Sequence, residues 1–385
     1  MKSVVVLGGI GLLAAAVFAW PARAVAYPQW QLSSGAVRCN QCHFAPAGGG
    51  LPNGYGRMEN GDELSTFEGD GMLLHGKAQL PSWLALGADL RGALVSQDVQ
   101  DPNGPTLAAF PMQADAEARV AFHAFSLYVT AGLRGQVRSD SDTMVPSQSF
   151  QPVSTSEFIS REHWLMWQPD PVGFYARVGR FFAPFGLRLA EHITYIRRDL
   201  GFNQLEESYN ASGGYISDQW EAHVTAFAPD FVRHIGSDES GVAGYYERRF
   251  LNQTGAWGAQ LKIATGPGMT RYITGGVGKY YLGLLRTLFL AEADLVHLSF
   301  DGASRDQLIG LAGLSTFPIK GVMVTLLEEL NQEDLAVRGA GRTASTALLG
   351  WFPYPHCELQ VMGRLDFPMG QPATKTLFTQ AHYFF

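Results

Sequence analysis

The regular alternation of apolar and polar side chains, over about ten residues at a time, constrains the fold of this chain most. In Met112–Phe122 every second residue is apolar, beginning with Met112, and polar residues such as Asp115 and Glu117 stand between them. A helix would mix these two sets around its circumference, whereas a strand separates them onto opposite faces. The segment is therefore predicted to be a β-strand with one polar and one apolar face.

Similar runs recur along the chain from Trp83 onward. The segment Phe125–Val137 repeats the alternation after a two-residue turn, His123–Ala124. Runs of about ten residues suit strands that cross a bilayer at a tilt, and short turns alternating with longer polar loops are typical of outer-membrane barrels. Further strand-like runs cover residues 220–228, 257–264, 322–330 and 357–367.

A soluble β-sandwich would also alternate, because one face of each of its sheets is wet. The C-terminal segment "LFTQAHYFF" favours the membrane barrel: its alternate residues share one apolar face, and it stops at Phe385. Such an ending resembles the terminal strand of bacterial outer-membrane proteins. We therefore predict an all-β fold, a transmembrane antiparallel β-barrel of about 16 strands (range 14–16) over residues 81–385. Aromatic residues expected in its interfacial girdle are Trp164, Trp167, Phe174, Tyr175, Trp351 and Tyr354.

The first residues predict export. An apolar run of 17 residues follows Lys2 and Ser3 and precedes an A-x-A site at Ala24–Ala26. Residues 1–26 are therefore predicted to be a signal peptide, cleaved after Ala26. The alternative is an uncleaved membrane anchor, for which the run is short. Cleavage would leave 26 basic and 35 acidic residues, a net charge near −9. Such a charge argues against nucleic acid as a partner, because binding to phosphates needs a basic face.

Residues 27–80 differ in texture from the rest of the chain. Gly48–Gly50 are consecutive glycines, and several Asn-Gly and Gly-Asp pairs follow them, all of which mark turns and loops. We predict a small irregular module there. A module of this size buries little surface on folding and normally needs a staple such as a metal or a covalent cofactor.

The motif "CNQCH" within this module predicts the staple. Two thiols separated by two residues can each reach one vinyl group of a porphyrin, and the adjacent histidine is then held beneath the iron. Cys39 and Cys42 are therefore predicted to be the thioether anchors of one covalent haem c, with His43 as the proximal iron ligand. One alternative is a redox dithiol, which normally occurs in a βαβ context that this sequence does not show. The other is half of a zinc site, for which the sequence has no second C-x-x-C.

The sixth ligand of the haem iron is open at this level. The candidates in the module are Met58, Met72 and His75, and we place His75 first. A methionine ligand would raise the reduction potential relative to histidine. An open position, or a ligand supplied by the barrel, is the alternative.

Polar side chains on the inward phase of the predicted strands admit two interpretations. A porin lumen is polar in any case. Alternatively, some of the acids could gather a cation such as Fe²⁺, which accepts carboxylate oxygens. The residues concerned are Asp89, Arg91, Asp115, Glu117, Arg119, Arg134, Glu221, His223, Glu292 and Asp294.

The order of parts resembles one known architecture, the fused outer-membrane monohaem cytochrome–porins of iron-oxidising bacteria. In addition, "GRFFAPFG" (Gly179–Gly186) looks like the G-R-x-x-x-P-F-G segment of many porins, including phosphate-selective ones. The resemblance implies covalent haem c, ligation by His43, and electron transfer across the bacterial outer membrane. In that family the electron donor is extracellular Fe(II).

Two functions follow as expectations. In the first, electrons pass from an extracellular donor, with Fe(II) as the candidate, to a periplasmic carrier, which would make the chain an Fe(II) oxidase. The apolar band of such a barrel is about 25 Å tall, so the haem module must then lie in the lumen as a plug, for which 16 strands leave room. In the second, the chain is a porin for small solutes or anions, and the module is a structural plug or gate.

Overall fold

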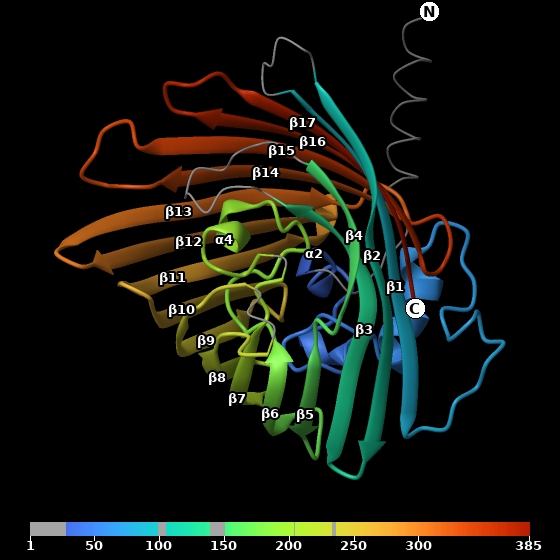
Figure 1. Cartoon of the computed structure of the whole chain (residues 1–385). Helices are drawn as coiled ribbons and strands as arrows, with labels where there is room; N and C mark the ends of the chain where they lie inside the picture. Colours follow the sequence, from blue (N-terminus) through green and yellow to red (C-terminus); the bar gives the residue numbers. More distant parts are fainter. Residues whose placement is uncertain (1–27, 99–104, 139–150, 204, 233–235) are drawn as a thin grey trace, which may run out of the picture.

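A computed structural model describes residues 28–98, 105–138, 151–203, 205–232 and 236–385 (Figure 1). The predicted signal peptide, residues 1–26, lies outside these ranges. The side chain of Arg134 also lies outside the described part, so its inward orientation stays a prediction. Within the described ranges, no helix is both long and apolar enough to cross a membrane.

The strands form one closed antiparallel sheet, in which strands that are neighbours in sequence pair, except that β4 and β5 both pair with β3; β1 pairs with both β2 and β17. The barrel is therefore closed by the first and last strands. The strands are β1 (Leu84–Asp98), β2 (Thr106–Phe122), β3 (Phe125–Arg138), β4 (Gln151–Ile159), β5 (His163–Trp167), β6 (Gly173–Phe181), β7 (Ser208–Ile216), β8 (Trp220–Ala228), β9 (Ser240–Phe250), β10 (Gly255–Gly266), β11 (Met269–Leu282), β12 (Thr287–Phe300), β13 (Ala303–Thr316), β14 (Val322–Gln332), β15 (Gly341–Trp351), β16 (Cys357–Pro368) and β17 (Thr374–Phe384).

Two of these strand segments share one place in the wall. β4 pairs with Gly132–Arg138 of β3, and β5 pairs with Phe125–Val129 of the same strand. The two segments therefore act as one strand that is interrupted at residues 160–162. The 17 segments of the described chain therefore make a 16-stranded barrel. This confirms the all-β barrel and the expected strand number.

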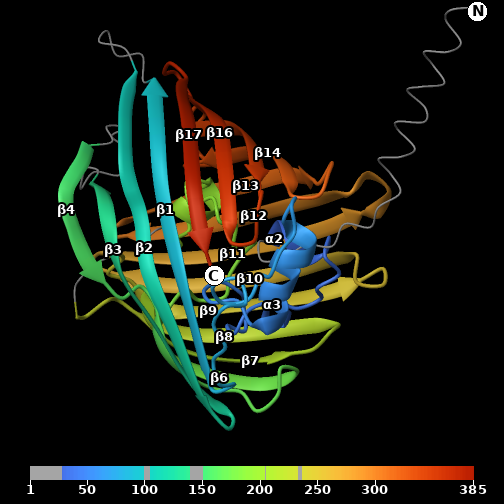
Figure 2. The same ribbon diagram turned by 90° about the vertical axis from the view of Figure 1, so that its right-hand side faces the viewer.

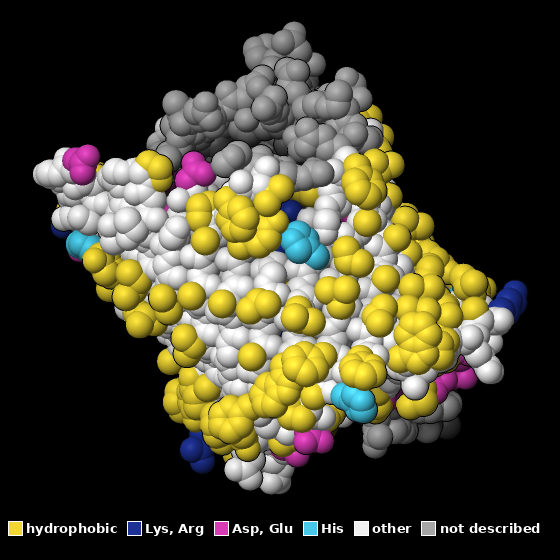
Figure 3. Space-filling model, turned by 60° about the horizontal axis from the view of Figure 1, so that its bottom comes forward, with side chains coloured by type: hydrophobic (Ala, Val, Ile, Leu, Met, Phe, Trp, Pro, Cys, Tyr) yellow, Lys and Arg dark blue, Asp and Glu magenta, His cyan; other side chains and the backbone are white. Residues whose placement is uncertain are grey.

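Alternation orients the side chains as the sequence predicts. On β2, Asp115 is 2% exposed inside the barrel, whereas on β3 Leu127 is 55% exposed on the outer face. Figure 3 shows apolar side chains distributed over the outer face of the wall, with few charged groups among them. The polar residues of the inward phase listed above, apart from Arg134, are buried or half-buried inside.

Met112 is an exception to the predicted phase. The register between β1 and β2 shifts between Arg91 and Gly92, which pair with Gln113 and Pro111 respectively. Met112 is thus the extra residue of a β-bulge, and a bulge re-aims a side chain. It is buried and faces the interior instead of the outer, apolar face.

Two residues expected in the aromatic girdle are also interior residues. Trp164 and Tyr175 are buried, whereas Trp167, Phe174 and Tyr354 are exposed. Trp164 lies three positions before Trp167, and Tyr175 lies one position after Phe174; odd separations along a strand place side chains on opposite faces. The expected girdle is therefore right for the outward phase and wrong for Trp164 and Tyr175.

The chain before β1 forms a compact module without a strand ladder. It contains α2 (Pro28–Gln31), η1 (Cys39–Gln41), α3 (Gly54–Glu59) and η2 (Asn60–Leu64). Figure 2 shows α2 and α3 at one end of the barrel, beside the C-terminus. We call this the module end. The short turns "HA", "FPIKG" and "PYPH" of the sequence lie there, and the longer loop 333–340 lies at the opposite end.

A second segment enters the barrel from the wall. Between β6 and β7, residues 182–203 and 205–207 leave the sheet and fold into the lumen, where they form the short helix α4 (Tyr195–Arg198). We call these residues the inner loop. A further single turn, η3 (Gly283–Leu285), connects β11 and β12.

Candidate functional site

The module is fixed to the barrel by contacts with the turns at the module end. Trp30 is buried, with its ring centroid 4.1 Å from that of Phe317 and 5.7 Å from that of Phe352. Both phenylalanines lie in or next to turns that join neighbouring strands. The backbone amides of Thr66 and Phe67 donate to the carbonyls of Phe352 and Pro353, at 2.8 and 3.0 Å.

Polar contacts fix the cysteine segment to the opposite side of the same rim. Asn40, which lies between the two cysteines, donates to the carbonyl of Pro171 at 2.6 Å. Arg38 forms an ion pair with Asp218 at 3.1 Å. The module therefore spans the mouth of the barrel at this end, whereas the sequence-based expectation is a plug in the lumen.

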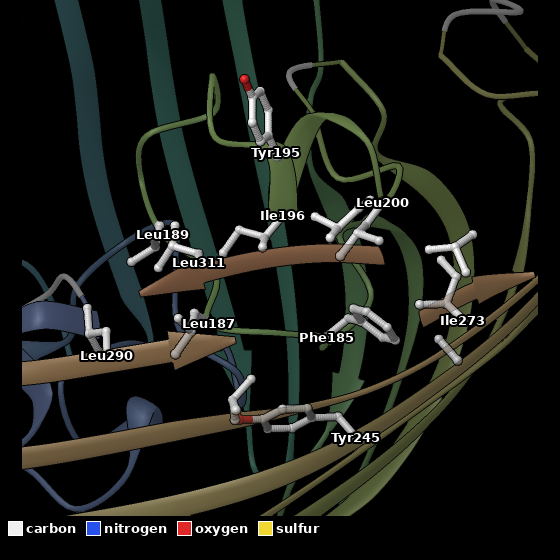
Figure 4. Packing of buried hydrophobic residues seen from close by; sticks show 14 of the residues in the cluster. Phe185, Leu187, Leu189, Tyr195, Ile196, Leu200, Tyr245, Ile273, Leu290 and Leu311 are labelled. Atoms are coloured by element: carbon white, nitrogen blue, oxygen red, sulfur yellow. The ribbon is translucent and has the colours of Figure 1, made fainter. Parts of the chain in front are cut away.

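The inner loop packs on the wall of the lumen through apolar side chains. Figure 4 shows Leu187, Leu189 and Ile196 of the loop among residues such as Leu290 and Leu311 from β12 and β13. Burying this many apolar side chains stabilises the loop inside the barrel.

Glu292 of β12 and Gln260 of β10 accept hydrogen bonds from the beginning of the inner loop. Glu292 accepts a hydrogen bond from the backbone amide of Leu187 at 2.7 Å, and Gln260 accepts one from Gly186 at 2.8 Å. Gln260 in turn donates to Glu292 and Asp294. Gly186 has a φ of +65°, and a Cβ there would lie 2.4 Å from Glu292, so the segment "GRFFAPFG" needs glycine at its end.

The module and the inner loop enclose a cavity of about 340 Å³. This volume lies within the roughly 300–1,000 Å³ range of small-molecule and cofactor pockets. Cys39, Cys42 and His43 line it from the module, and Phe185 and Arg188 line it from the inner loop. The structure thus places all three residues of the predicted haem motif on one cavity inside the barrel.

The local backbone explains how the motif is presented. The amides of Cys42 and His43 both donate to the carbonyl of Cys39, which closes a single helical turn at η1. Cys42 and His43 are buried, and all three cysteines of the described chain are free thiols. The turn packs closely on α3, because a Cβ at Gly56 would lie 2.2 Å from the Cys42 carbonyl oxygen.

The chemistry of the thiols disfavours a redox dithiol. Burial raises the pKa of Cys42 to about 12, and burial also raises the pKa of Cys39. A reactive dithiol needs a lowered thiol pKa, because the thiolate is the nucleophile. Among the residues described, no three His, Cys, Asp or Glu side chains are grouped as metal ligands, so the zinc alternative gains no support either.

The residues present fit haem c. His43 has its Nδ1 atom 3.2 Å from the carbonyl oxygen of Gly50. Metal-ligating histidines usually donate one ring N–H to a carbonyl, which fixes the ring and assigns the other nitrogen to the metal. Cys39 and Cys42 would hold the porphyrin by thioether bonds, and His43 Nε2 would ligate the iron.

The predicted candidates for the sixth ligand lie elsewhere. Met58 and Met72 are 50% and 43% exposed, His75 is exposed, and none of them lines the cavity. Apart from Cys39, Cys42 and His43, the sulfur and imidazole side chains that line it are Met112, His192, His356 and His382.

Two of these cavity-lining histidines are held by other groups. His382 contacts the carboxylates of Asp89 and Glu358 at 3.1 and 2.8 Å, and His356 Nε2 lies 3.3 Å from the Met72 carbonyl oxygen. Met112 reaches the cavity only through the bulge on β2, and His192 only through the inner loop. The apolar–polar alternation of the strands therefore could not identify Met112 or His192 as residues that line the cavity.

Most of the lumen acids that could have gathered a cation have structural partners instead. Glu292 and Asp294 belong to the inner-loop anchor described above. Glu221 lies 3.5 Å from Arg188, 3.4 Å from His223 and in contact with Arg249. Asp115 pairs with Arg161 at 3.1 Å. The interpretation of these residues as a polar lumen is the one their contacts support.

Comparison with known proteins connects the fold to one structural class. No family model and no curated protein matches the sequence. Among solved structures, OprB of Pseudomonas putida matches with a TM-score of 0.58 and 10% identity, over 78% of this chain and 94% of its own. OmpT of Vibrio cholerae matches with a TM-score of 0.57 and 10% identity, over 80% and 100%. An anion-selective porin of Comamonas acidovorans matches with 0.56 and 11%, over 78% and 99%. The chain thus has the fold of 16-stranded outer-membrane porins, with an N-terminal module added at one mouth.

Proposed function

We propose that the chain is an outer-membrane porin-type barrel whose periplasmic mouth is closed by residues 28–83, which carry one covalent haem c. The observation that carries this proposal is the cavity inside the barrel, which Cys39, Cys42 and His43 share with the inner loop. Similarity in fold to porins supports location in the bacterial outer membrane, with the apolar outer face against lipid.

The module end is the periplasmic end in this proposal. The short turns and the C-terminus lie there, and outer-membrane barrels have their short turns on the periplasmic side. Haem is attached to such motifs after export, so the motif must be reachable from the periplasm. The position of the module is consistent with both requirements.

As a porin, the barrel would pass small solutes or anions only through the space that the module and the inner loop leave open. The test is conductance of the purified full-length chain in planar bilayers. We expect small, discrete conductance steps, because two segments fill the lumen. A large and unselective conductance would refute the role of the module as a plug.

A second function, electron transfer, is favoured by the position of the haem motif inside the wall rather than on the rim's outer surface. Haem c would supply one-electron redox chemistry there. The chain would then accept electrons from an extracellular donor, with Fe(II) as the candidate, and pass them to a periplasmic carrier. Arg188, 3.9 Å from Cys39 Sγ, and the aromatic rings of the inner loop would exclude water around the cofactor.

The two functions are separated by mixing the oxidised, haem-loaded chain with Fe(II) and following the haem absorption bands. Reduction supports electron transfer, and its absence with every extracellular donor tried would refute it. The control is His43→Ala, which removes the proximal ligand. A variant that keeps the conductance of the wild type and loses reduction would assign the module a redox role.

A further inference from the structure

Arg177 is a cation without an anion at the wall of the cavity. It lies on β6, opposite Met166 of β5 and Ser212 of β7, and its side chain faces inward with 3% of the residue exposed. It lines the same cavity as Cys39 and His43. Its guanidinium carbon lies 3.6 Å from the ring centroid of Phe181 and 5.6 Å from that of Trp164.

Most other cations of the cavity have carboxylate partners. Arg161 pairs with Asp115 and Glu207, and the remaining ion pairs are Arg91 with Asp89, Arg188 with Glu221, Lys279 with Glu247 and Arg38 with Asp218. Arg57 and Arg197 donate to backbone carbonyls. In the described part of the chain, Arg177 has neither a hydrogen bond nor an ion pair, and its Nε is buried without a partner.

A buried guanidinium in this state is unfavourable. Contact with two aromatic faces compensates part of the lost hydration, but it satisfies none of the five N–H donors. Glu162 acts on Arg177 electrostatically, but the two side chains form no ion pair within 4 Å. Arg177 therefore presents unpaired positive charge at the wall of the cavity, where a carboxylate could bind it.

We propose that Arg177 binds a carboxylate inside this cavity. In the haem-loaded chain the carboxylate is a propionate of the haem, and this part rests on the proposed function above. In a chain without haem, a small carboxylate that diffuses into the barrel can occupy the same place. Planar bidentate binding by arginine is the chemistry that both sources share.

The first arm of the test is a redox titration of the haem-loaded, full-length chain. Arg177→Gln removes a positive charge beside the cofactor, so we expect the equilibrium constant for reduction to fall roughly tenfold, about 59 mV for a one-electron couple. Loss of the guanidinium also raises the pKa of the propionate, so the pH range in which the potential depends on pH moves upward. Arg177→Lys keeps the positive charge but cannot bind in the planar bidentate manner, so we expect its potential and pH dependence to lie between those of the wild type and of Arg177→Gln.

Arg248→Gln is the matched control. Arg248 is exposed on the outer face of β9, so the substitution makes the same change in charge away from the cavity. We expect it to leave the potential and its pH dependence unchanged. Folding of each variant is checked by the heat-dependent mobility shift that closed barrels show in gel electrophoresis.

The second arm uses the full-length double variant Cys39→Ser, Cys42→Ser, which cannot attach haem. Acetate is added to a bilayer in which the barrel conducts chloride, and its inhibition of the current is measured. If a diffusing carboxylate binds Arg177, Arg177→Gln weakens this inhibition, and Arg248→Gln does not.

The outcomes identify the source of the carboxylate. An effect in the first arm alone assigns the haem propionate, and an effect in the second arm alone assigns a diffusing carboxylate. The absence of both effects overturns the proposal. Loss of the Arg177 effect in a Glu162→Gln background would overturn it too, because Glu162 would then be the partner. Whether haem is attached is read separately from the mass of the chain, so failure of the proposed function is distinguishable.

Discussion

We predict that acid pH weakens the docking of the module on the barrel, because undocking allows His356 to be protonated. His356 lies in the turn between β15 and β16, and 1% of it is exposed. Its backbone amide donates to the side chain of Asn60 at 2.9 Å, and its Nε2 lies 3.3 Å from the Met72 carbonyl oxygen. Both partners belong to the module. Burial lowers the pKa of His356 from its ordinary value of 6.5 to about 4.

The direction and size of the effect follow from this pKa. Above about pH 6.5 the imidazole is neutral whether or not the module is docked, so docking keeps its full stability. Below that pH, a His356 exposed by undocking takes up a proton that the buried side chain does not. Docking therefore weakens as pH falls toward 4, by about 3 kcal/mol in total. His75, whose ring centroid lies 4.9 Å away, and Arg57 also oppose protonation.

Hydrogen exchange at two amides measures docking directly. The amides of Thr66 and Phe67 belong to the module and donate to the carbonyls of Phe352 and Pro353 at the rim. We expect their free energy of opening, corrected for intrinsic exchange rates, to fall by about 3 kcal/mol from about pH 7 to about pH 4. Amides in the middle of β12 serve as the control. If His356→Gln shows the same pH dependence as the wild type, His356 is not the responsible group.

Three further substitutions test the contacts that place the site. Trp30→Ala should weaken docking by roughly 3–5 kcal/mol and expose residues 28–83 to protease, whereas Trp83→Ala, at a half-exposed position, should not. Glu292→Ala leaves the Leu187 amide without its acceptor, so we expect the inner loop to lose about 1–3 kcal/mol of stability. The bilayer conductance should then rise. An unchanged conductance would show that the loop does not constrict the lumen. Gly56→Ala forces a Cβ against the C-x-x-C-H turn, so the purified chain should carry less haem; normal haem content would contradict the packing described.

The barrel could be predicted well from the sequence because the alternation of apolar and polar side chains is a property of each strand by itself. A strand with one face in lipid and one in a polar lumen must alternate, and the runs at residues 220–228 and 322–330 coincide with β8 and the body of β14. The departures come from contacts that alternation does not encode. Met112 is turned inward by a bulge whose cause lies in the pairing with β1. The inner loop leaves the wall because apolar surface on β11–β13 receives it, which depends on residues about a hundred positions away.

The candidate site divides along the same lines. The C-x-x-C-H spacing of Cys39, Cys42 and His43 is visible in the sequence, so the sequence alone predicts haem. The wall around them is assembled from distant strands, and the positions of Arg177 and His192 at the cavity follow from closure of the barrel and from the inner loop. Alternation in β6 places Arg177 on the inward face, but it does not reveal that Arg177 lacks an anionic partner among the described residues, whereas Arg180 on the same strand has two carboxylates within 4 Å.

The central claim is that the C-x-x-C-H motif carries haem inside a porin-type barrel. The most direct measurement is the mass of the purified full-length chain after expression with the haem-attachment machinery, combined with its absorption spectrum in alkaline pyridine. We expect one covalently bound haem, which is absent in the Cys39→Ser, Cys42→Ser double variant while the barrel stays folded. A folded wild-type chain without haem, in which Cys39 and Cys42 react as free thiols after unfolding, would contradict it.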